Sequence, residues 1–212
     1  MEITTWYLEQ DDAARIRPAR PPVVPVEIVR AELPSPELNR FLYTAVGGDW
    51  SWSDRLPWTW RQWRDWLDRP GVETWVAYVR GTPAGYAELD GSEPGRVEIA
   101  YFGLLPSFAG QGLGGHLLTV ALRHAWSLPE RHGLAPVRRV TVNTCSLDGP
   151  AALANYQARG LSIERTATRP AGSQATAPGP WPGAGDRQPA TRRPGDGGND
   201  RRGSSAGDGE TG

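Results

Sequence analysis

Between Val26 and Thr168 the sequence alternates strand-like with helix-like patterns, and this alternation limits the possible folds more than any other feature. Alternation of this kind is typical of α/β proteins, in which helices pack on the faces of a sheet. We therefore predict one α/β domain over residues 26–167. Strands are expected at 26–33, 74–80, 84–90, 96–105, 137–144 and 161–167, and four helices at 36–46, 59–68, 114–127 and 150–159.

Local signals mark several helix ends. Ser35 before Pro36 is a typical N-cap, and the segment from Thr59 to Gln62 fits a capping box. Gly160 is expected to end the last helix. In the second helix Trp60, Trp63 and Trp66 are predicted to anchor the core.

Both flanks differ in composition from the domain. Residues 1–25 are Pro-rich and charged, which predicts an N-terminal arm on which Trp6, Tyr7 and Leu8 are the residues able to pack. Residues 168–212 are rich in Gly, Pro and Arg, with Trp181 as the only large apolar side chain. Because so little apolar surface cannot offset the entropy of ordering, we expect a disordered tail.

Composition excludes several chemistries. All 23 basic positions besides histidine are arginine, so a Walker lysine and a pyridoxal Schiff base are impossible. One cysteine, Cys145, and three separated histidines make no disulfide framework or metal site. The net charge of −1 gives no reason to expect nucleic acid as a partner, and no apolar run indicates a membrane segment. A cytoplasmic protein is expected.

The strongest chemical signal is the turn Gly110-Gln111-Gly112-Leu113-Gly114-Gly115, between a buried strand and an amphipathic helix. Glycines leave backbone N–H groups uncovered, and the following helix adds roughly half a positive charge at its N-terminus. These features predict a phosphate cradle. The turn also fits the G-x-G-x-x-G pattern of dinucleotide folds, but no acid ends the next strand and too few residues follow for that fold.

A second motif accompanies this turn. Leu104-Leu105-Pro106 precedes it, and the segment from Ala152 to Leu161 contains Tyr156 four residues before Gly160. Together these segments resemble the GNAT superfamily of acetyl-coenzyme A dependent N-acetyltransferases. The resemblance implies a mixed twisted sheet that splays open between strands 96–105 and 137–144. The coenzyme's pantetheine arm would bond the backbone at Gly103, Leu104 and Leu105, and its pyrophosphate would lie on residues 110–115.

The sequence departs from the family pattern at two positions. Ala109 stands where the phosphate loop usually begins with Gln or Arg, and Gly149 stands where an asparagine is frequent. Phosphate binding must then rely on backbone donors, with help from Gln111.

Acyl transfer to an amine needs a base for the ammonium and an acid for the leaving thiolate. Tyr156 matches the family's acidic tyrosine, although a tyrosine at this spacing is also a common core residue. Glu98 is the one acidic residue in a largely apolar strand, 13 residues before Gln111, as in relatives that use a strand glutamate as base. Simple alternation places Glu98 on one face with Ala100, Phe102 and Leu104. The alternative for Glu98 is a structural pair with an arginine.

The residues that would bind the acceptor amine are predicted from the tryptophans of one loop. Trp50, Trp52 and Trp58, with Asp49 and Asp54, lie in the loop that lines the acceptor site in this superfamily, and aromatic walls beside carboxylates suit a cationic amine. The alternative is that these tryptophans only pack within the protein.

Cys145 has no histidine beside it, so direct transfer to a small-molecule or peptide amine is expected. The rival hypothesis is an inactive acyl-coenzyme A sensor or interaction module on the same fold.

Overall fold

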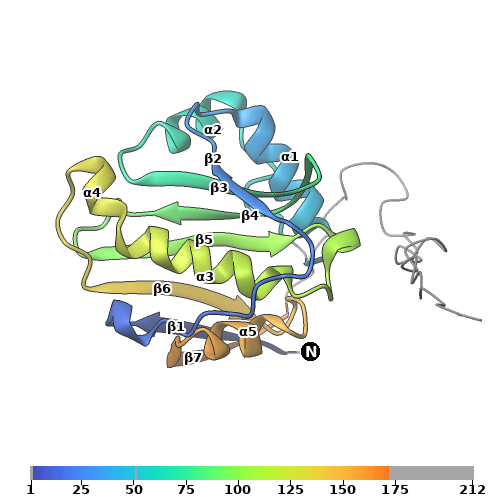
Figure 1. The fold of residues 1–212 in the computed structure, drawn as a ribbon, viewed down its shortest axis with the longest axis vertical. Coiled ribbons are helices and arrows are strands. Elements are labelled where there is room, and N and C mark those ends of the chain that lie inside the picture. The colour runs from blue at the N-terminus through green and yellow to red at the C-terminus, as the bar shows by residue number, and fades with distance from the viewer. Residues whose placement is uncertain (1, 51, 172–212) are drawn as a thin grey trace, which may run out of the picture.

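The computed structural model describes residues 2–50 and 52–171, which form a mixed seven-stranded sheet with helices on both faces (Figure 1). The strand order is β2-β3-β4-β5-β6-β1-β7, and among the strands of the described residues only β5 and β6 pair in parallel. The predicted fold class is confirmed. The strands are β1 (Glu2–Gln10), β2 (Glu27–Arg30), β3 (Val72–Val79), β4 (Thr82–Asp90), β5 (Arg96–Leu104), β6 (Arg139–Cys145) and β7 (Ser162–Pro170). The helices are α1 (Pro36–Gly47), α2 (Trp60–Leu67), α3 (Leu113–Trp126), α4 (Leu128–His132) and α5 (Ala152–Ala158).

An apolar cluster fills each face of the sheet. On the face covered by α3, Leu118 and Leu122 pack against Ile99 of the central strand β5. On the opposite face, Leu42 and Val46 of α1 form the second cluster with residues of β3 and β4. Figure 1 shows α3 lying along the middle of the sheet, with α1 and α2 at its upper end. Among the described residues, no helix is both long enough and apolar enough to cross a bilayer.

The N-terminal segment differs from its prediction. Residues 2–10, expected in an arm, form β1, which lies inside the sheet between β6 and β7 and is antiparallel to both. Ile3 and Leu8 are 1% exposed, and burial of such side chains supplies the free energy that orders the strand. The chain then crosses the outer side of α3, where the Ala19 N–H donates to Thr119 Oγ1 at 3.0 Å. The predicted tail begins within β7, and from residue 172 it lies outside the described residues.

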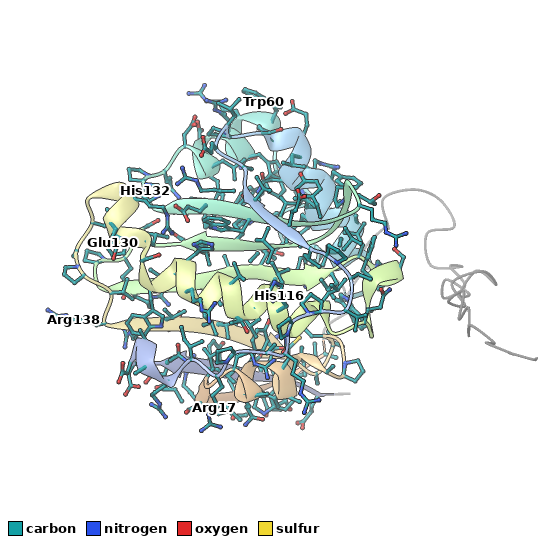
Figure 2. The ribbon with its side chains drawn as sticks, in the orientation of Figure 1. Arg17, Trp60, His116, Glu130, His132 and Arg138 are labelled. Carbon is teal, nitrogen blue, oxygen red and sulfur yellow. The ribbon has the colours of Figure 1, made fainter. Side chains whose placement is uncertain are left out.

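The predicted helix signals are present in the structure. Ser35 caps α1, both bonds of the Thr59–Gln62 capping box form at α2, and Gly160 ends α5 in the left-handed region with φ +96°. The tryptophan prediction holds only in part. Trp63 is 1% exposed, but Trp60 is 58% exposed and lies at the outer edge of the molecule (Figure 2).

A buried ion cluster ties α4 to the sheet at the end opposite the glycine turn (Figure 1). The Glu73 carboxylate accepts hydrogen bonds from Arg131 Nε at 2.7 Å, Arg131 Nη2 at 2.8 Å, Trp75 Nε1 at 2.9 Å and Arg30 Nη1 at 3.1 Å. His132 Nε2 lies 3.0 Å away. Burial alone would raise the pKa of Glu73, but the bonds from Arg131, Trp75 and His132 lower it to about 2.

This lowered pKa predicts a stability change in acid. The contribution of Glu73 is fully present above the unfolded-state pKa near 4.5 and is lost as the pH falls towards 2. Between pH 7 and pH 3 the free energy of unfolding should fall by about 2 kcal/mol through this group. In urea unfolding, Glu73→Gln should be less stable than the wild type at pH 7, with a smaller difference at pH 3. Glu32→Gln is the control, because Glu32 also pairs with Arg30 but its side chain is 76% exposed. An equal Glu73→Gln deficit at both pH values would contradict this account.

Candidate active site

The two central parallel strands separate along their length. β5 and β6 pair only at Arg96–Arg139, Val97–Val140 and Glu98–Thr141. Beyond Glu98, β5 stays paired with β4 as far as Leu104, while β6 stays paired with β1. The sheet therefore opens between β5 and β6, as the resemblance implies.

A β-bulge changes which residues of β5 face the same side. Leu89 pairs with Ile99 but Glu88 pairs with Tyr101, so Ala100 is the extra residue. After the bulge, Phe102 packs into the α3 cluster. Tyr101 joins the α1 cluster instead. The predicted alternation is therefore wrong beyond Ala100, and Glu98 shares its face with Tyr101 rather than with Phe102 and Leu104.

A single cleft of about 1220 Å³ passes through this opening and is lined from both faces of the sheet. On the α3 and α5 side its walls include Phe102, Leu104, Gly110, Gly114, Gly115, Asn155 and Tyr156. On the other side they include Thr5, Trp50, Trp52, Asp54, Arg55, Trp66, Asp90, Glu98, Tyr101, Asn143 and Cys145. The cleft exceeds the roughly 300–1,000 Å³ typical of a site for one drug-sized ligand. It therefore has room for a ligand larger than a typical drug-sized molecule, and residues of both faces of the sheet line it.

The glycine turn leaves its backbone donors open. Gly110 and Gly112 have φ of +76° and +78°, and a Cβ at either position would meet no atom within 4 Å. Gly112 is the N-cap of α3 but offers no side-chain cap, and the first turn contains no acidic residue. Free N–H groups at a helix N-terminus beside left-handed glycines suit an anion. The residues present therefore fit a diphosphate.

The predicted coenzyme-binding residues fall into two groups. Gly103, Leu104, Gly110, Gly114 and Gly115 line the cleft. The remaining four residues are not part of its lining. Leu113 is 2% exposed in the core, the Leu105 N–H donates to Ala84 O, Gln111 Nε2 donates to Ser107 O, and Gly112 caps the helix.

Tyr156 lies on the α3 side of the cleft. α5 places its ring 5.9 Å from that of Phe102, and the side chain is 5% exposed but lines the cleft. Burial, and then the charge of Asp148, raise the pKa of this phenol well above its usual value. The hydroxyl therefore stays protonated at neutral and moderately alkaline pH.

Glu98 lies on the opposite side, at the last paired position before the strands separate. Its side chain is 29% exposed, Asn143 Nδ2 donates to Oε1 at 3.4 Å, and Arg96 Nη2 lies 3.6 Å from Oε2. The arginine pair considered from the sequence is thus present, but it is long and leaves the carboxylate open to the cleft.

The predicted acceptor residues are only partly together. Trp50, Trp52 and Asp54 line the cleft, whereas Trp58 is absent from its lining. The ring of Trp58 faces the Arg55 guanidinium at 4.6 Å instead. Since the chain's own cation covers that ring, the sequence-based hypothesis for Trp58 loses its basis.

Sequence reasoning missed Arg55. Its guanidinium lies 4.0 Å from the Trp66 ring centre and 4.4 Å from that of Tyr101, and Nη1 donates to Glu88 Oε1 at 2.7 Å. Both partners are buried, with side-chain exposures of 5% and 1%. The available signal was an arginine inside a tryptophan-rich segment together with an acid in a strand-like run.

Asp54 forms a second polar group with two tyrosines. Its carboxylate accepts hydrogen bonds from Tyr43 Oη at 2.6 Å and from Tyr101 Oη. Burial comes first among the causes that raise the pKa of Tyr101, and the bond to Asp54 adds to it. The Asp54 carboxylate therefore lines the cleft between aromatic rings. Within residues 2–50 and 52–171, no three His, Cys, Asp or Glu side chains are grouped so that they could hold a metal.

Comparison with solved structures finds the same fold in other proteins. A GCN5-related N-acetyltransferase from Kribbella flavida has a TM-score of 0.55 at 18% identity over 78% of this chain and 56% of that one. A Drosophila protein gives 0.53 at 13% identity, over 79% and 50%. A tandem GNAT protein from the clavulanic acid biosynthesis pathway gives 0.50 at 16%, over 80% and 55%. The chain thus spans about half the length of these structures.

None of the curated proteins compared with the chain matches its sequence. The family model for the acetyltransferase (GNAT) family matches residues 34–161, which is more than half of the chain and includes the opened strands, the glycine turn and α5. The chain belongs to the GNAT family of acetyltransferases.

Proposed function

We propose that this protein transfers an acetyl group from acetyl-coenzyme A to a primary amine by direct attack within a ternary complex. The observation that carries the proposal is the single cleft that passes through the sheet, with Tyr156 on one side and Glu98 on the other. Two substrates entering from opposite faces would meet at the gap between β5 and β6. Holding them together there lowers the entropic part of the barrier.

On the coenzyme side, the backbone N–H groups of the glycine turn would hold the diphosphate, and the free edge of β5 at Gly103 and Leu104 would bond the pantetheine arm. Acetyl-coenzyme A supplies the thioester. Tyr156 would donate its phenolic proton, or a strong hydrogen bond, to the departing sulfur.

On the acceptor side, Glu98 would take a proton from the ammonium, directly or through a water. The freed amine nitrogen then forms a bond to the thioester carbon. As the carbon–sulfur bond breaks, the nitrogen loses a second proton, which replaces the one that Tyr156 gives to the sulfur, so that an amide, a thiol and a protonated Glu98 result. Asp54, Trp50 and Trp52 line the same side, and this combination of carboxylate and aromatic rings favours an acceptor that carries positive charge.

The test is a thiol-release assay with acetyl-coenzyme A across polyamines, aminoglycosides, basic peptides and arylamines. We expect turnover with at least one cationic primary amine. Binding of acetyl-coenzyme A without turnover on any amine would favour the sensor or interaction module.

Glu98→Gln is expected to lower kcat/KM at pH 7 about 10²-fold or more, because the amide accepts no proton. The limb of the pH–rate profile that reports the base should also disappear. Glu93→Gln is the matched control, since Glu93 pairs with the same Arg96 at 2.7 Å but lies outside the cleft. An unchanged profile in Glu98→Gln would return Glu98 to a structural role.

A further inference from the structure

Asn143 reaches across the opening between β5 and β6 to the proposed base. It lies on β6, two residues beyond Thr141, the last residue of this strand that pairs with β5. Val140 and Val142 pack into the α3 cluster, so alternation along β6 turns Asn143 to the opposite face, which is the face of Glu98. There Asn143 Nδ2 donates to Glu98 Oε1 at 3.4 Å, and both residues line the cleft. The contact therefore joins the two strands just beyond the point where their pairing ends.

The two oxygens of the Glu98 carboxylate have different partners. Oε2 lies 3.6 Å from Arg96 Nη2, but Arg96 Nε lies closer, at 2.7 Å, to Glu93 Oε2. The arginine is therefore shared between two carboxylates, whereas Asn143 contacts the other oxygen, Oε1. An ionised carboxylate only accepts hydrogen bonds, so the amide must turn its NH₂ group towards Glu98. This requirement fixes the orientation of the Asn143 amide.

The amide oxygen of Asn143 is left open to a ligand. Asn143 is exposed and lines the cleft, and within residues 2–50 and 52–171 its Oδ1 accepts no hydrogen bond. Oδ1 and Nδ2 are bonded to the same carbon, so a group that donates to Oδ1 lies beside the Glu98 carboxylate. A protonated primary amine carries several N–H donors on one nitrogen. It can therefore bond to Asn143 Oδ1 and to Glu98 at the same time.

We propose that Asn143 is a positioning residue for the proton transfer: its Nδ2 orients Glu98, and its Oδ1 accepts an N–H of the acceptor amine. The inference rests on the proposed function and deepens it, because it says how the base and the amine are brought together. Holding both at the edge of the opening places the amine nitrogen close to the gap in which the thioester would lie. Such alignment lowers the entropic part of the barrier.

The charged groups near Glu98 come from its own side of the sheet, from both neighbouring strands and from the loop before α2. They are Arg96, Glu93, Asp90, Arg139 and Asp54. Asp90 is the partner of Glu98 on β4, but its carboxylate pairs with Arg69 at 2.9 Å. All of these groups stay in place when only position 143 is changed. A change in the titration of Glu98 then reports the contact with Asn143.

The first test follows the titration of Glu98 by NMR in the full chain without ligand, using isotope-labelled glutamate carboxyl groups. The Glu98 signal is assigned by its loss in Glu98→Gln. Asn143→Asp should move the titration upward by about one pH unit or more, because a like charge replaces the donor. Asn143→Ala should move it upward by less, because only a hydrogen bond is lost. An unchanged titration in Asn143→Asp would overturn the proposal.

Thr141→Val is the matched control. Thr141 lies opposite Glu98 on β6, and its buried Oγ1 has no hydrogen-bond partner in the part of the chain that the structure describes. The variant therefore changes a side chain at the same place without removing a contact to Glu98. We expect the titration of Glu98 and the turnover of Thr141→Val to match those of the wild type.

Kinetics separate the two contacts of Asn143. With the amine of the panel above that turns over fastest, Asn143→Ala should lower kcat/KM about 10- to 100-fold and raise the KM for the amine, because both contacts are lost. Asn143→Asp keeps an oxygen for the acceptor, so its KM should not rise, while the limb of the pH–rate profile that reports the base should move to higher pH. An unchanged KM in Asn143→Ala would overturn the contact between Oδ1 and the acceptor.

Failure of this inference can be told apart from failure of the proposed function. If the wild type turns over no amine, the proposed function fails, and the contact of Oδ1 with an acceptor fails with it. The NMR titration needs neither substrate, so it still decides whether Nδ2 holds Glu98. If the wild type is active but Asn143→Ala has wild-type kinetics, only the role of Asn143 is refuted.

Discussion

Replacement of Tyr156 by Phe is expected to lower the turnover number about 10²- to 10⁴-fold, the usual contribution of a positioned acid. The substitution removes only the hydroxyl and keeps the ring that packs near Phe102. Because burial raises the pKa of Tyr156, the wild-type phenol keeps its proton over the assay range, and its loss is not masked by titration. Thiol release gives the turnover number, and calorimetry should show little change in affinity for acetyl-coenzyme A.

Tyr86→Phe provides the matched control. Tyr86 is 1% exposed and lies outside the cleft lining, so its variant loses a hydroxyl at similar depth without touching the proposed chemistry. We expect its turnover to stay near that of the wild type. A Tyr156→Phe protein with wild-type turnover would show that the leaving sulfur takes its proton from another group.

The second large effect concerns stability. Arg55→Ala is expected to lower the free energy of unfolding by about 3–5 kcal/mol, because it leaves the Glu88 carboxylate buried without its ion-pair partner. Burial raises the pKa of Glu88, so its ionised form depends on Arg55 and on the bond from Trp66. For a domain of this size the melting temperature should fall by roughly 6–20 °C.

Arg69→Ala is the control for position 55. The Arg69 guanidinium also lies over Trp66, at 3.6 Å, and pairs with Asp90, but its side chain is 34% exposed. Loss of the Arg69 side chain should lower the free energy of unfolding by about 1 kcal/mol or less. The double change Arg55→Met with Glu88→Leu should recover much of the lost stability, because no charge is then left unpaired. An Arg55→Ala protein as stable as the wild type would contradict this role of the ion pair.

Local features of the fold were predictable from the sequence. Ser35, Thr59 and Gly160 mark helix ends because capping depends on residues a few positions apart. The glycine turn and the strand that precedes it were equally readable, since both are contiguous patterns. Such short-range patterns are enough to locate most strands and the glycine turn along the chain.

The errors concern contacts between distant segments. The bulge at Ala100 depends on how β5 pairs with β4, so alternation along β5 alone puts Glu98 beside the wrong neighbours. β1 is ordered by pairing with β6 and β7, which lie far away along the chain. The sequence alone leaves Trp58 open between acceptor binding and packing, because nothing in it shows that Arg55 covers the ring.

A crystal structure of the full chain with coenzyme A is the most direct test of the central claim. We predict a diphosphate on the backbone N–H groups of Gly110 to Gly115 and a pantetheine arm between β5 and β6, with its sulfur near the Tyr156 hydroxyl. Coenzyme bound elsewhere, or β5 and β6 closed along their full length in the complex, would contradict the account.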